Sequence, residues 1–274
     1  MATILIAGAG YIGSALGTHL HEKGHRVWAL RRRVELLPTG LEPLALDMRD
    51  PQNLSSLPES IDTVFYTAAA QGFTPEAYHQ AYVLNLQNIL DALLKQKRPP
   101  KRFIFTSSTG VYAQNDGSWV DENSPTTPTG FSGQEVLAGE MLLKEAPLET
   151  IALRFGGIYG PERRRLLESV RTGQAQLAPE PARYTNRIHR DDCVGMLEHL
   201  MELQRPEGVY NGVDSESAAY NEVLLWLAER LEVEPPTVGD PPRRGNKRCK
   251  NKRILQSGYR LRYPSFREGY EAMI

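Results

Sequence analysis

The sequence predicts an α/β protein in which helices cover both faces of a doubly wound parallel sheet and a smaller lobe follows at the C-terminal end. Short apolar runs typical of buried parallel strands alternate with amphipathic helical stretches through the first half of the 274 residues. The first run, Thr3–Ala7, ends in a glycine-rich turn that opens a helix. Both observations favour repeated strand–helix–strand units over an all-helical or all-strand fold.

The elements of the first half alternate strictly. After the glycine-rich turn, Ile12, Leu16 and Leu20 lie four residues apart on one helical face, and Gly24 is placed to end that helix. The later elements are recognised in the same way, the strands by short apolar runs and the helices by apolar residues that recur on one helical face. We expect strands at 25–30, 41–46, 62–67, 101–106 and 150–155, and helices at 75–97 and 134–144.

The second half is less regular. Asp191 and Asp192 are placed to cap a helix over 191–203, and residues 220–231 predict a second amphipathic helix. We therefore expect residues 1–156 to form the sheet domain, with the helix at 191–203 packed back on it. Residues 157–190 and 204–274 are expected to form the smaller lobe.

The composition is that of an ordinary globular protein, with 41% hydrophobic residues and a net charge of −1. A disordered chain is therefore excluded, and no global field attracts nucleic acid or a membrane. The two cysteines, Cys193 and Cys249, are too far apart in sequence to suggest a disulfide framework or a thiolate metal site. No apolar run is long enough to span a membrane, so we expect a cytoplasmic protein that binds no metal.

Positive charge is concentrated near the C-terminal end. The stretch from Arg243 to Arg267 contains ten basic residues and no acidic one. We favour the interpretation that this stretch lines a cleft for an anionic small molecule, with a solvated surface as the second choice. Nucleic-acid binding, which also needs clustered cations, is the least favoured because Ile254 and Leu255 indicate a folded helix here.

The glycine-rich turn has the GxGxxG spacing of a Rossmann-type dinucleotide site. Gly8 permits the tight turn, Gly10 lets a pyrophosphate approach the backbone, and Gly13 allows close helix packing. The N-terminus of the following helix favours an anion. The expected cofactor-binding residues are Gly8, Gly10, Tyr11, Ile12 and Gly13. A glycine turn without a ligand is the alternative.

The end of the second strand indicates which dinucleotide binds. An NAD-binding chain carries Asp or Glu about 20 residues into the motif, where it accepts hydrogen bonds from the ribose 2′-hydroxyl. Here that position is followed by Arg31, Arg32 and Arg33, with no carboxylate before Glu35. Guanidinium groups suit a 2′-phosphate, so we expect Arg31 and Arg32 to favour NADP over NAD. A solvated basic turn is the alternative.

Six further stretches follow the glycine motif in order: LDMRD at 46–50, DTVFYTAAA at 62–70, NLQNIL at 85–90, TSSTGVY at 106–112, RFGGIYGP at 154–161 and IHRDD at 188–192. Together they resemble the extended short-chain dehydrogenase/reductases, also called the NAD-dependent epimerase/dehydratase family. The resemblance implies a catalytic role for Ser108 and a strand-pinning role for Asn85. It also implies cofactor contacts from Asp47, Met48, Ala68, Ala69, Ala70, Thr106 and Ser107.

The chain departs from that family at its proton-transfer pair. The family carries a Tyr followed four residues later by Lys, which lowers the pKa of the phenol. With Glu140 as the anchor, these positions hold Ser132 and Val136, and a shift by one residue gives Phe131 and Glu135. The chain therefore resembles the atypical branch of the family, which implies fold and nucleotide binding more strongly than epimerase chemistry.

Other side chains are candidates for the substrate site in the smaller lobe and at its border. Tyr112 or Tyr159 could replace the missing phenol, and Arg154 or Arg187 could bind a substrate anion or pair with acids. His189 is a candidate proton donor or phosphate ligand, with a structural role as the alternative. Thr109, Phe131 and Ser132 complete the expected substrate-site residues.

Two hypotheses follow from these patterns. The first is an NADP-dependent oxidoreductase or epimerase that acts on a small hydroxyl- or carbonyl-bearing substrate, including nucleotide sugars, with Ser108 holding the substrate oxygen. The second is a non-catalytic NADP(H) binder that senses redox state, which the missing Tyr and Lys favour. A homodimer is compatible with either hypothesis.

Overall fold

The computed structural model describes residues 1–241 and 245–274, which divide into two compact units. Unit 1 comprises Met1–Val111, Thr126–Arg154 and Val194–Tyr210, and unit 2 comprises Tyr112–Pro125, Phe155–Cys193 and Asn211–Ile274. The segment 112–125, which we expected in the sheet domain, lies in unit 2. The reason is that β6 (Trp119–Val120) pairs in parallel with β11 (Arg248–Cys249).

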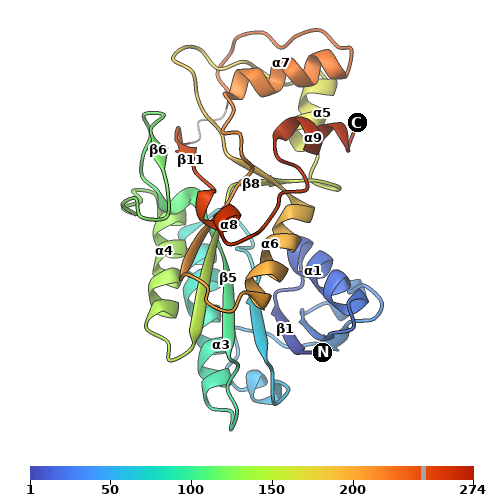
Figure 1. The fold of residues 1–274 in the computed structure, drawn as a ribbon, viewed down its shortest axis with the longest axis vertical. Helices are drawn as coiled ribbons and strands as arrows, with labels where there is room; N and C mark the ends of the chain where they lie inside the picture. The colour runs from blue at the N-terminus through green and yellow to red at the C-terminus, as the bar shows by residue number, and fades with distance from the viewer. Residues whose placement is uncertain (242–244) are drawn as a thin grey trace. The chain divides into compact units, whose positions relative to one another are not determined.

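Unit 1 is built on a parallel sheet whose strand order, over the described residues, is β3-β2-β1-β4-β5-β7-β10 (Figure 1). The strands are β1 (Thr3–Ala7), β2 (Arg26–Leu30), β3 (Glu42–Leu44), β4 (Thr63–Tyr66), β5 (Arg102–Ser108), β7 (Glu149–Phe155) and β10 (Val209–Gly212). The chain winds outward from β1 to one edge and then fills the other half from β4. This is the doubly wound arrangement, so the predicted fold class is confirmed.

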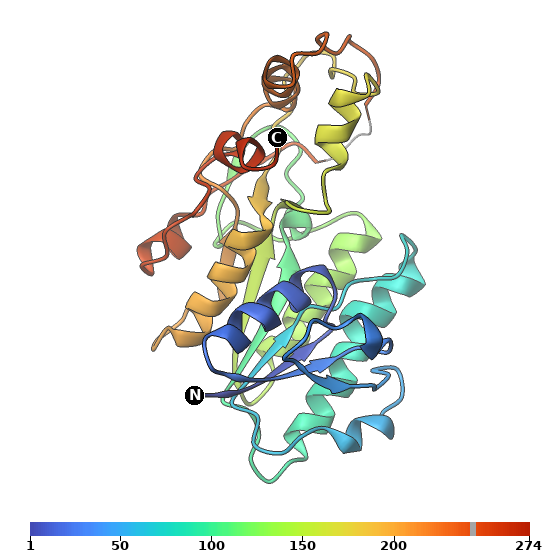
Figure 2. The ribbon, with the colours of Figure 1, turned by 90° about the vertical axis from the view of Figure 1, so that its right-hand side faces the viewer.

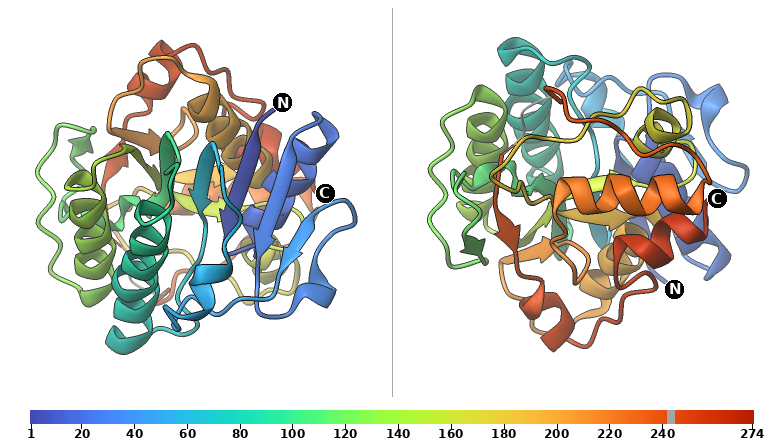
Figure 3. Two further views of the ribbon diagram at one scale, coloured as in Figure 1. Left: turned by 90° about the horizontal axis from the view of Figure 1, so that it is seen from below. Right: turned by 90° about the horizontal axis from the view of Figure 1, so that it is seen from above.

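Helices cover both faces of this sheet. The helices α1 (Tyr11–Glu22) and α6 (Arg190–Glu202) lie on one face, and α3 (Asn85–Leu94) and α4 (Phe131–Lys144) on the other (Figures 2 and 3). Glu198 of α6 binds His19 Nε2 at 2.8 Å and Lys23 Nζ at 2.5 Å, which joins α6 to α1. Because both faces are covered, the central strand residues Ile4, Leu5 and Ile6 are fully buried.

The helix expected at 75–97 is interrupted. It consists of α2 (Pro75–His79), a π-helical turn at Gln80–Leu84 and then α3. The Tyr66 hydroxyl donates a hydrogen bond to the carbonyl oxygen of Ala81, which competes with the regular helical bond to that oxygen. The sequence could not reveal this interruption because it depends on a strand residue that lies 15 positions away.

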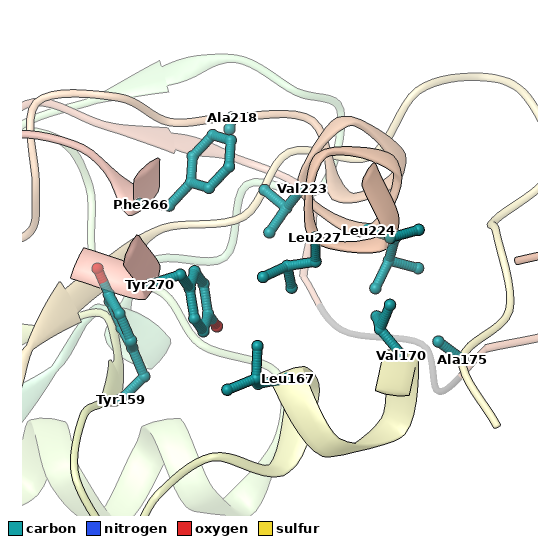
Figure 4. Packing of buried hydrophobic residues seen from close by; sticks show 11 residues of the cluster. Tyr159, Leu167, Val170, Ala175, Ala218, Val223, Leu224, Leu227, Phe266 and Tyr270 are labelled. Atoms are coloured by element: carbon teal, nitrogen blue, oxygen red, sulfur yellow. The ribbon is translucent and has the colours of Figure 1, made fainter. Parts of the chain in front are cut away.

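Unit 2 has its own core around α7 (Tyr220–Arg230). The buried residues shown in Figure 4 include Leu167 and Val170 of α5 (Arg165–Arg171) and Phe266 and Tyr270 of α9 (Phe266–Glu271). Ser265 and Glu268 form a capping box that begins α9. The remaining elements are β8 (Gly157–Tyr159), β9 (Arg187–His189) and α8 (Lys252–Gln256).

Much of the basic stretch is paired within unit 2. Arg267 binds Glu216 and Glu222 at 2.6 Å, and the Arg248 guanidinium lies 4.9 Å from the Trp119 ring and 4.5 Å from the Tyr184 ring. Arg253 donates to Asn123, and Arg262 lies 3.6 Å from Asp191. Arg243 and Arg244 lie outside the described residues. Several charges of this stretch are therefore already balanced or stacked within unit 2, and its role in lining a cleft for an anion stays a prediction.

The described parts of the chain contain no helix with both the length and the apolar character needed to cross a bilayer. They also contain no group of three His, Cys, Asp or Glu side chains placed to hold a metal ion. Cys193 and Cys249 are buried free thiols.

Candidate nucleotide site and active site

Gly8 holds the turn between β1 and α1 against the loop that follows β4. Its φ of +101° lies in the region that favours glycine, and a Cβ here would stand 2.5 Å from the Cα of Ala68. Thr67 Oγ1 donates to the Gly8 carbonyl at 2.8 Å, and the Gly8 N–H donates to the Leu30 carbonyl at 3.1 Å. The turn is therefore fixed by β2 and by the end of β4 before any ligand binds.

Gly13 is tightly packed, whereas Gly10 has open space where a side chain would be. A Cβ on Gly13 would stand 2.5 Å from Thr67 Oγ1 and 2.7 Å from the Gly8 carbonyl, so glycine is needed for packing. On Gly10 the nearest atom to such a Cβ is the Gly8 carbonyl oxygen at 3.9 Å. Gly10 also begins α1 without a side-chain cap, which leaves the helix N-terminus to an anion. This open face beside a locked turn fits the diphosphate of a dinucleotide.

The two arginines after β2 are placed differently. Arg31 Nη1 donates to the carbonyl of Ala9 at 3.1 Å and to that of Leu36 at 3.3 Å, so this side chain braces the glycine-rich turn. Arg32 is exposed at the end of β2, near Asp47. The sequence alone did not distinguish these roles, because both side chains follow the same strand.

The loop after β3 is anchored by neighbours. Asp47 accepts hydrogen bonds from Arg49 Nε at 3.0 Å and Nη2 at 2.5 Å. Hydrogen bonds from Arg49 hold the pKa of Asp47 below its usual value, and the charge of Arg32 adds to this effect. The carbonyl of Met48 accepts from Asn88 Nδ2 at 2.9 Å. Asn88, which the sequence analysis does not single out, therefore ties α3 to the loop of Asp47 and Met48.

Asn85, the residue expected to pin the central strands, accepts a hydrogen bond from Gln80 Nε2 at 2.9 Å. Its bond lies within the helical segment, next to the π-helical turn. Ala68, Ala69 and Ala70 follow β4 directly, and of these Ala68 meets the glycine-rich turn.

Three hydroxyl residues end β5 and point to different partners. Thr106 Oγ1 donates to the Tyr66 carbonyl at 3.0 Å, and the buried Ser107 Oγ donates to Glu140 Oε1 at 2.5 Å. Ser108 Oγ accepts from the Gly110 N–H at 3.0 Å, which leaves its own proton to donate. Ser108 is thus the hydroxyl best placed to meet a substrate oxygen, whereas the Ser107 side chain faces α4.

A buried ion pair supports this strand end. Glu140 Oε1 and Oε2 accept from Arg154 Nε at 2.9 Å and Nη2 at 2.6 Å, and both residues are buried. The geometry is the two-point contact that guanidinium and carboxylate groups favour. We therefore reassign Arg154 from a substrate contact to a structural support of Ser107, because its charge is met by a carboxylate of α4.

The first turn of α4 occupies the place of the family's Tyr and Lys. Ser132 is half-buried, and Val136 is buried. A Cβ on Gly133 would stand 2.5 Å from the Gly110 carbonyl, so this turn packs against the loop that binds Ser108. The Phe131 ring lies 4.9 Å from the Phe73 ring.

The two tyrosines considered as replacement phenols are buried in unit 2. The Tyr112 hydroxyl donates to Asn211 Oδ1 at 2.9 Å. Tyr159 stacks on Tyr270 with 4.5 Å between ring centroids, and burial raises the pKa of Tyr159. Both expectations are corrected, because neither hydroxyl is presented at an open surface. Thr109 is also buried.

His189 and Arg187 of β9 are buried as well. His189 is 2% exposed, its Nδ1 accepts from the Asp191 N–H at 3.2 Å, and burial lowers its pKa. Arg187 donates to Thr185 Oγ1. The geometry favours a structural role for His189, which is the alternative given above. Arg187 is likewise buried and bound to Thr185, which favours a structural role over a contact with a substrate anion.

Asp192 does not cap α6 as expected, because the helix begins earlier, at Arg190. Its carboxylate accepts from the Tyr259 hydroxyl at 2.8 Å and from the N–H groups of Arg262 at 2.7 Å and Tyr263 at 3.0 Å. Asp192 therefore holds the segment between α8 and α9 within unit 2.

Comparisons with known proteins agree with the doubly wound fold and the glycine-rich turn described above. The protein YeeZ of Escherichia coli K12 is 28% identical over 248 residues, which are 86% of each chain. A solved structure described as a putative NAD-dependent epimerase/dehydratase from Methylobacillus flagellatus is 36% identical, with a TM-score of 0.83 over 99% of this chain and 97% of that one.

A second solved structure, MoeE5 in complex with UDP-glucose and NAD, is 28% identical. Its TM-score is 0.83 over 99% of this chain and 97% of that one. The sequence profile of the NAD dependent epimerase/dehydratase family matches residues 4–183, a range that contains the glycine-rich turn, the end of β5 and the first turn of α4. The chain belongs to the NAD dependent epimerase/dehydratase family.

Proposed function

We propose that this protein is an NADP(H)-dependent oxidoreductase that acts on a small carbonyl- or hydroxyl-bearing molecule. The observation that carries the proposal is the glycine-rich turn, in which Gly8 and Gly13 are locked while Gly10 leaves an open face at the start of α1. Ser108, at the end of β5, supplies a hydroxyl that can donate a hydrogen bond to a substrate oxygen and hold it in place. A bound nicotinamide cofactor would supply or accept the hydride.

The proposed preference for NADP rests on the end of β2. Arg32 is exposed there, and the carboxylate nearest to it, Asp47, is held by Arg49. A 2′-phosphate would therefore meet a guanidinium, whereas a free ribose hydroxyl would lack the usual acceptor. The MoeE5 structure contains NAD, so the preference needs a direct measurement.

Lys247 of unit 2 is a candidate to bind an anionic ligand group. This residue of unit 2 is 8% exposed, and its Nζ donates to the Tyr112 carbonyl at 3.0 Å. Within the described ranges no carboxylate pairs with it, and burial lowers its pKa. A buried ammonium without a carboxylate is costly to keep, which is consistent with a ligand that supplies the negative charge. UDP-glucose, which MoeE5 binds, is an anion of this kind.

Lys247→Met tests this interpretation through stability. At pH 7 the variant is expected to melt about 2–4 °C above the wild type, the shift that about 1 kcal/mol produces in a protein of this size. Burial lowers the pKa of Lys247 in the folded state, so the cost of burying its charge is present at neutral pH. This cost falls as the pH rises toward the pKa of Lys in the unfolded chain. Differential scanning calorimetry at pH 7 and pH 10 measures the difference in melting temperature between Lys247→Met and the wild type. An equal difference at the two pH values would contradict the interpretation of Lys247 as a buried charge without a carboxylate.

A non-catalytic NADP(H) sensor is the second candidate function. The observation that favours it is the pair Ser132 and Val136 at the positions of the family's proton-transfer residues, neither of which titrates. Such a protein would bind the nucleotide with the same glycine-rich turn but would not transfer hydride.

Titration with NADPH and NADH by protein fluorescence, followed by absorbance at the nicotinamide band, separates the two functions. The enzyme is expected to bind NADPH more tightly than NADH and to oxidise it with a carbonyl compound or to reduce NADP⁺ with a hydroxyl compound. Saturable binding with no turnover over a broad panel would favour the sensor. Failure to bind either nucleotide would contradict both functions.

Arg32→Ala is expected to weaken NADPH binding by about 10–100-fold, the loss of one charge-assisted hydrogen bond. NADH binding should change less than twofold, because NADH lacks the 2′-phosphate. Arg33→Ala is the matched control, since Arg33 is equally exposed and one residue further from β2. Isothermal titration of both nucleotides measures the effect, and an equal loss for NADPH and NADH would refute the 2′-phosphate assignment.

A further inference from the structure

A histidine of α2 and a glutamate of α4 form a pair in unit 1. His79 Nδ1 lies 2.9 Å from Glu135 Oε2, and the side chains are 48% and 24% exposed. In the part of the chain that the structure describes, His79 Nε2 has no hydrogen-bond partner. One ring nitrogen is therefore held by a carboxylate, and the other belongs to a half-exposed side chain and is not used by a neighbour among the described residues.

The position of Glu135 connects this pair to the expected active site. Phe131 and Glu135 lie one helical turn apart on α4, at the positions that a one-residue shift assigns to the family's Tyr and Lys. Gly133, between them, packs on the Gly110 carbonyl, and the Gly110 N–H binds Ser108. The first turn of α4 thus joins the His79–Glu135 pair to the loop that carries the serine.

Aromatic rings border the pair on the α2 side. Tyr78, the neighbour of His79, lies 5.4 Å from the Phe131 ring and 5.6 Å from the Phe73 ring. Phe73 is 72% exposed, so these rings form a partly exposed apolar cluster between the loop before α2, α2 itself and the first turn of α4. An apolar wall next to a proton donor excludes water from a bound carbonyl group.

We propose that His79 is the proton donor and acceptor of the reaction and that Glu135 is its positioning residue, in place of the missing Tyr and Lys. The inference rests on the proposed oxidoreductase function. In carbonyl reduction the carbonyl carbon gains a hydride from NADPH, and the π electron pair moves to oxygen. That oxygen takes the proton from Nε2 of protonated His79, which leaves an alcohol, a neutral imidazole and NADP⁺. Alcohol oxidation runs the same steps in reverse.

Glu135 performs two tasks in this arrangement. By accepting a hydrogen bond from Nδ1–H, the Glu135 carboxylate selects the neutral tautomer whose Nε2 carries no proton, and it fixes the orientation of the ring. The other titratable groups around His79 are Glu76 on α2 and the phenols of Tyr78 and Tyr82. Burial raises the pKa of Tyr82 to about 12, so this phenol stays neutral over the range in which histidine titrates.

The competing explanation is an ordinary ion pair between two surface helices. Such pairs contribute little to stability, with a typical range of about 0–1 kcal/mol. A structural pair of that kind would affect neither the rate of hydride transfer nor its pH dependence. The experiment must therefore separate rate, nucleotide affinity and folding.

The test compares His79→Gln and Glu135→Gln with the wild type, with Glu76→Gln on the same helix as control. NADPH affinity is measured by fluorescence titration. Reduction of 9,10-phenanthrenequinone and of 1-phenyl-1,2-propanedione by NADPH is followed between pH 5 and pH 9. Thermal melting confirms folding, and glutamine at position 79 can still bind Glu135.

We expect His79→Gln to lower kcat by about 10²–10⁴-fold, the usual contribution of a general acid, with NADPH affinity within twofold of the wild type. A general acid makes kcat fall as the pH rises, and this fall should be absent from His79→Gln. Glu135→Gln is expected to lower kcat by about 10-fold while NADPH affinity stays within twofold of the wild type. Glu76→Gln should leave the rate and the profile unchanged.

Two results would overturn the proposal and leave nucleotide binding intact. One is a His79→Gln variant with the wild-type rate and pH profile. The other is a wild-type protein that binds NADPH saturably but reduces neither probe, which is the behaviour of a non-catalytic binder. A wild-type protein that does not bind NADPH would instead overturn the proposed function itself, and the proton donor with it.

Discussion

Glu140→Ala is expected to lower the free energy of unfolding by about 3–5 kcal/mol, the cost of removing one partner of a buried ion pair. The variant leaves the Arg154 guanidinium buried without its carboxylate, and Ser107 Oγ loses its acceptor. Urea unfolding followed by circular dichroism measures the change. Because Ser107 adjoins Ser108 on β5, the loss should also disturb the end of the strand that carries the proposed substrate contact.

A second ion pair in unit 1 is the matched control. Arg102 of β5 binds Glu149 of β7, but Glu149 is 43% exposed, and Arg102 keeps hydrogen bonds to the carbonyls of Leu200 and Met201. Glu149→Ala should therefore cost less than about 1 kcal/mol. The double variant Glu140→Met with Arg154→Met is expected to be more stable than Glu140→Ala, because no charge is left buried. Equal losses for the two alanine variants would contradict the dry environment of the Glu140–Arg154 pair.

The sheet could be predicted because each strand leaves a local pattern. The runs at 3–7 and 101–106 are apolar throughout, as burial on both faces requires, and they became β1 and β5. β10 escaped prediction because Val209–Gly212 is too short and too mixed in character to form such a run. The break between α2 and α3 escaped it because the cause, the Tyr66 hydroxyl, lies on another element.

The glycine-rich turn could be predicted from the sequence for the same reason, and its role in binding a nucleotide stays a prediction. Its chemistry lies in contiguous residues from Gly8 to Gly13, and each glycine has a local steric or conformational requirement. The substrate candidates were predicted less well. Arg154, Tyr159 and His189 carry chemistry in the sequence, yet their burial and partners are set by tertiary packing. The His79–Glu135 pair joins residues 56 positions apart, so no motif could have indicated it.

Gly10→Ala is expected to weaken NADPH binding by about 10–100-fold, since a methyl group forced against a ligand costs about 1–3 kcal/mol. The free protein should lose less stability than with Gly8→Ala, because no protein atom approaches the added Cβ more closely than 3.9 Å and φ is negative at −93°, although the ψ of −146° lies outside the regions that alanine favours. Affinity and stability are therefore expected to separate in this variant. Fluorescence titration and thermal melting measure the two quantities.

Gly8→Ala provides the contrasting case within the same turn. Its φ of +101° and the 2.5 Å approach of a Cβ to Ala68 Cα should lower the unfolding free energy by about 2–5 kcal/mol without any nucleotide present. Gly208→Ala, with nothing within 4 Å of the added Cβ, is the neutral control. If Gly10→Ala bound NADPH like the wild type, the open face at the start of α1 would not receive the diphosphate. The dinucleotide would then have to bind elsewhere, since Gly8 and Gly13 offer no other approach to the turn.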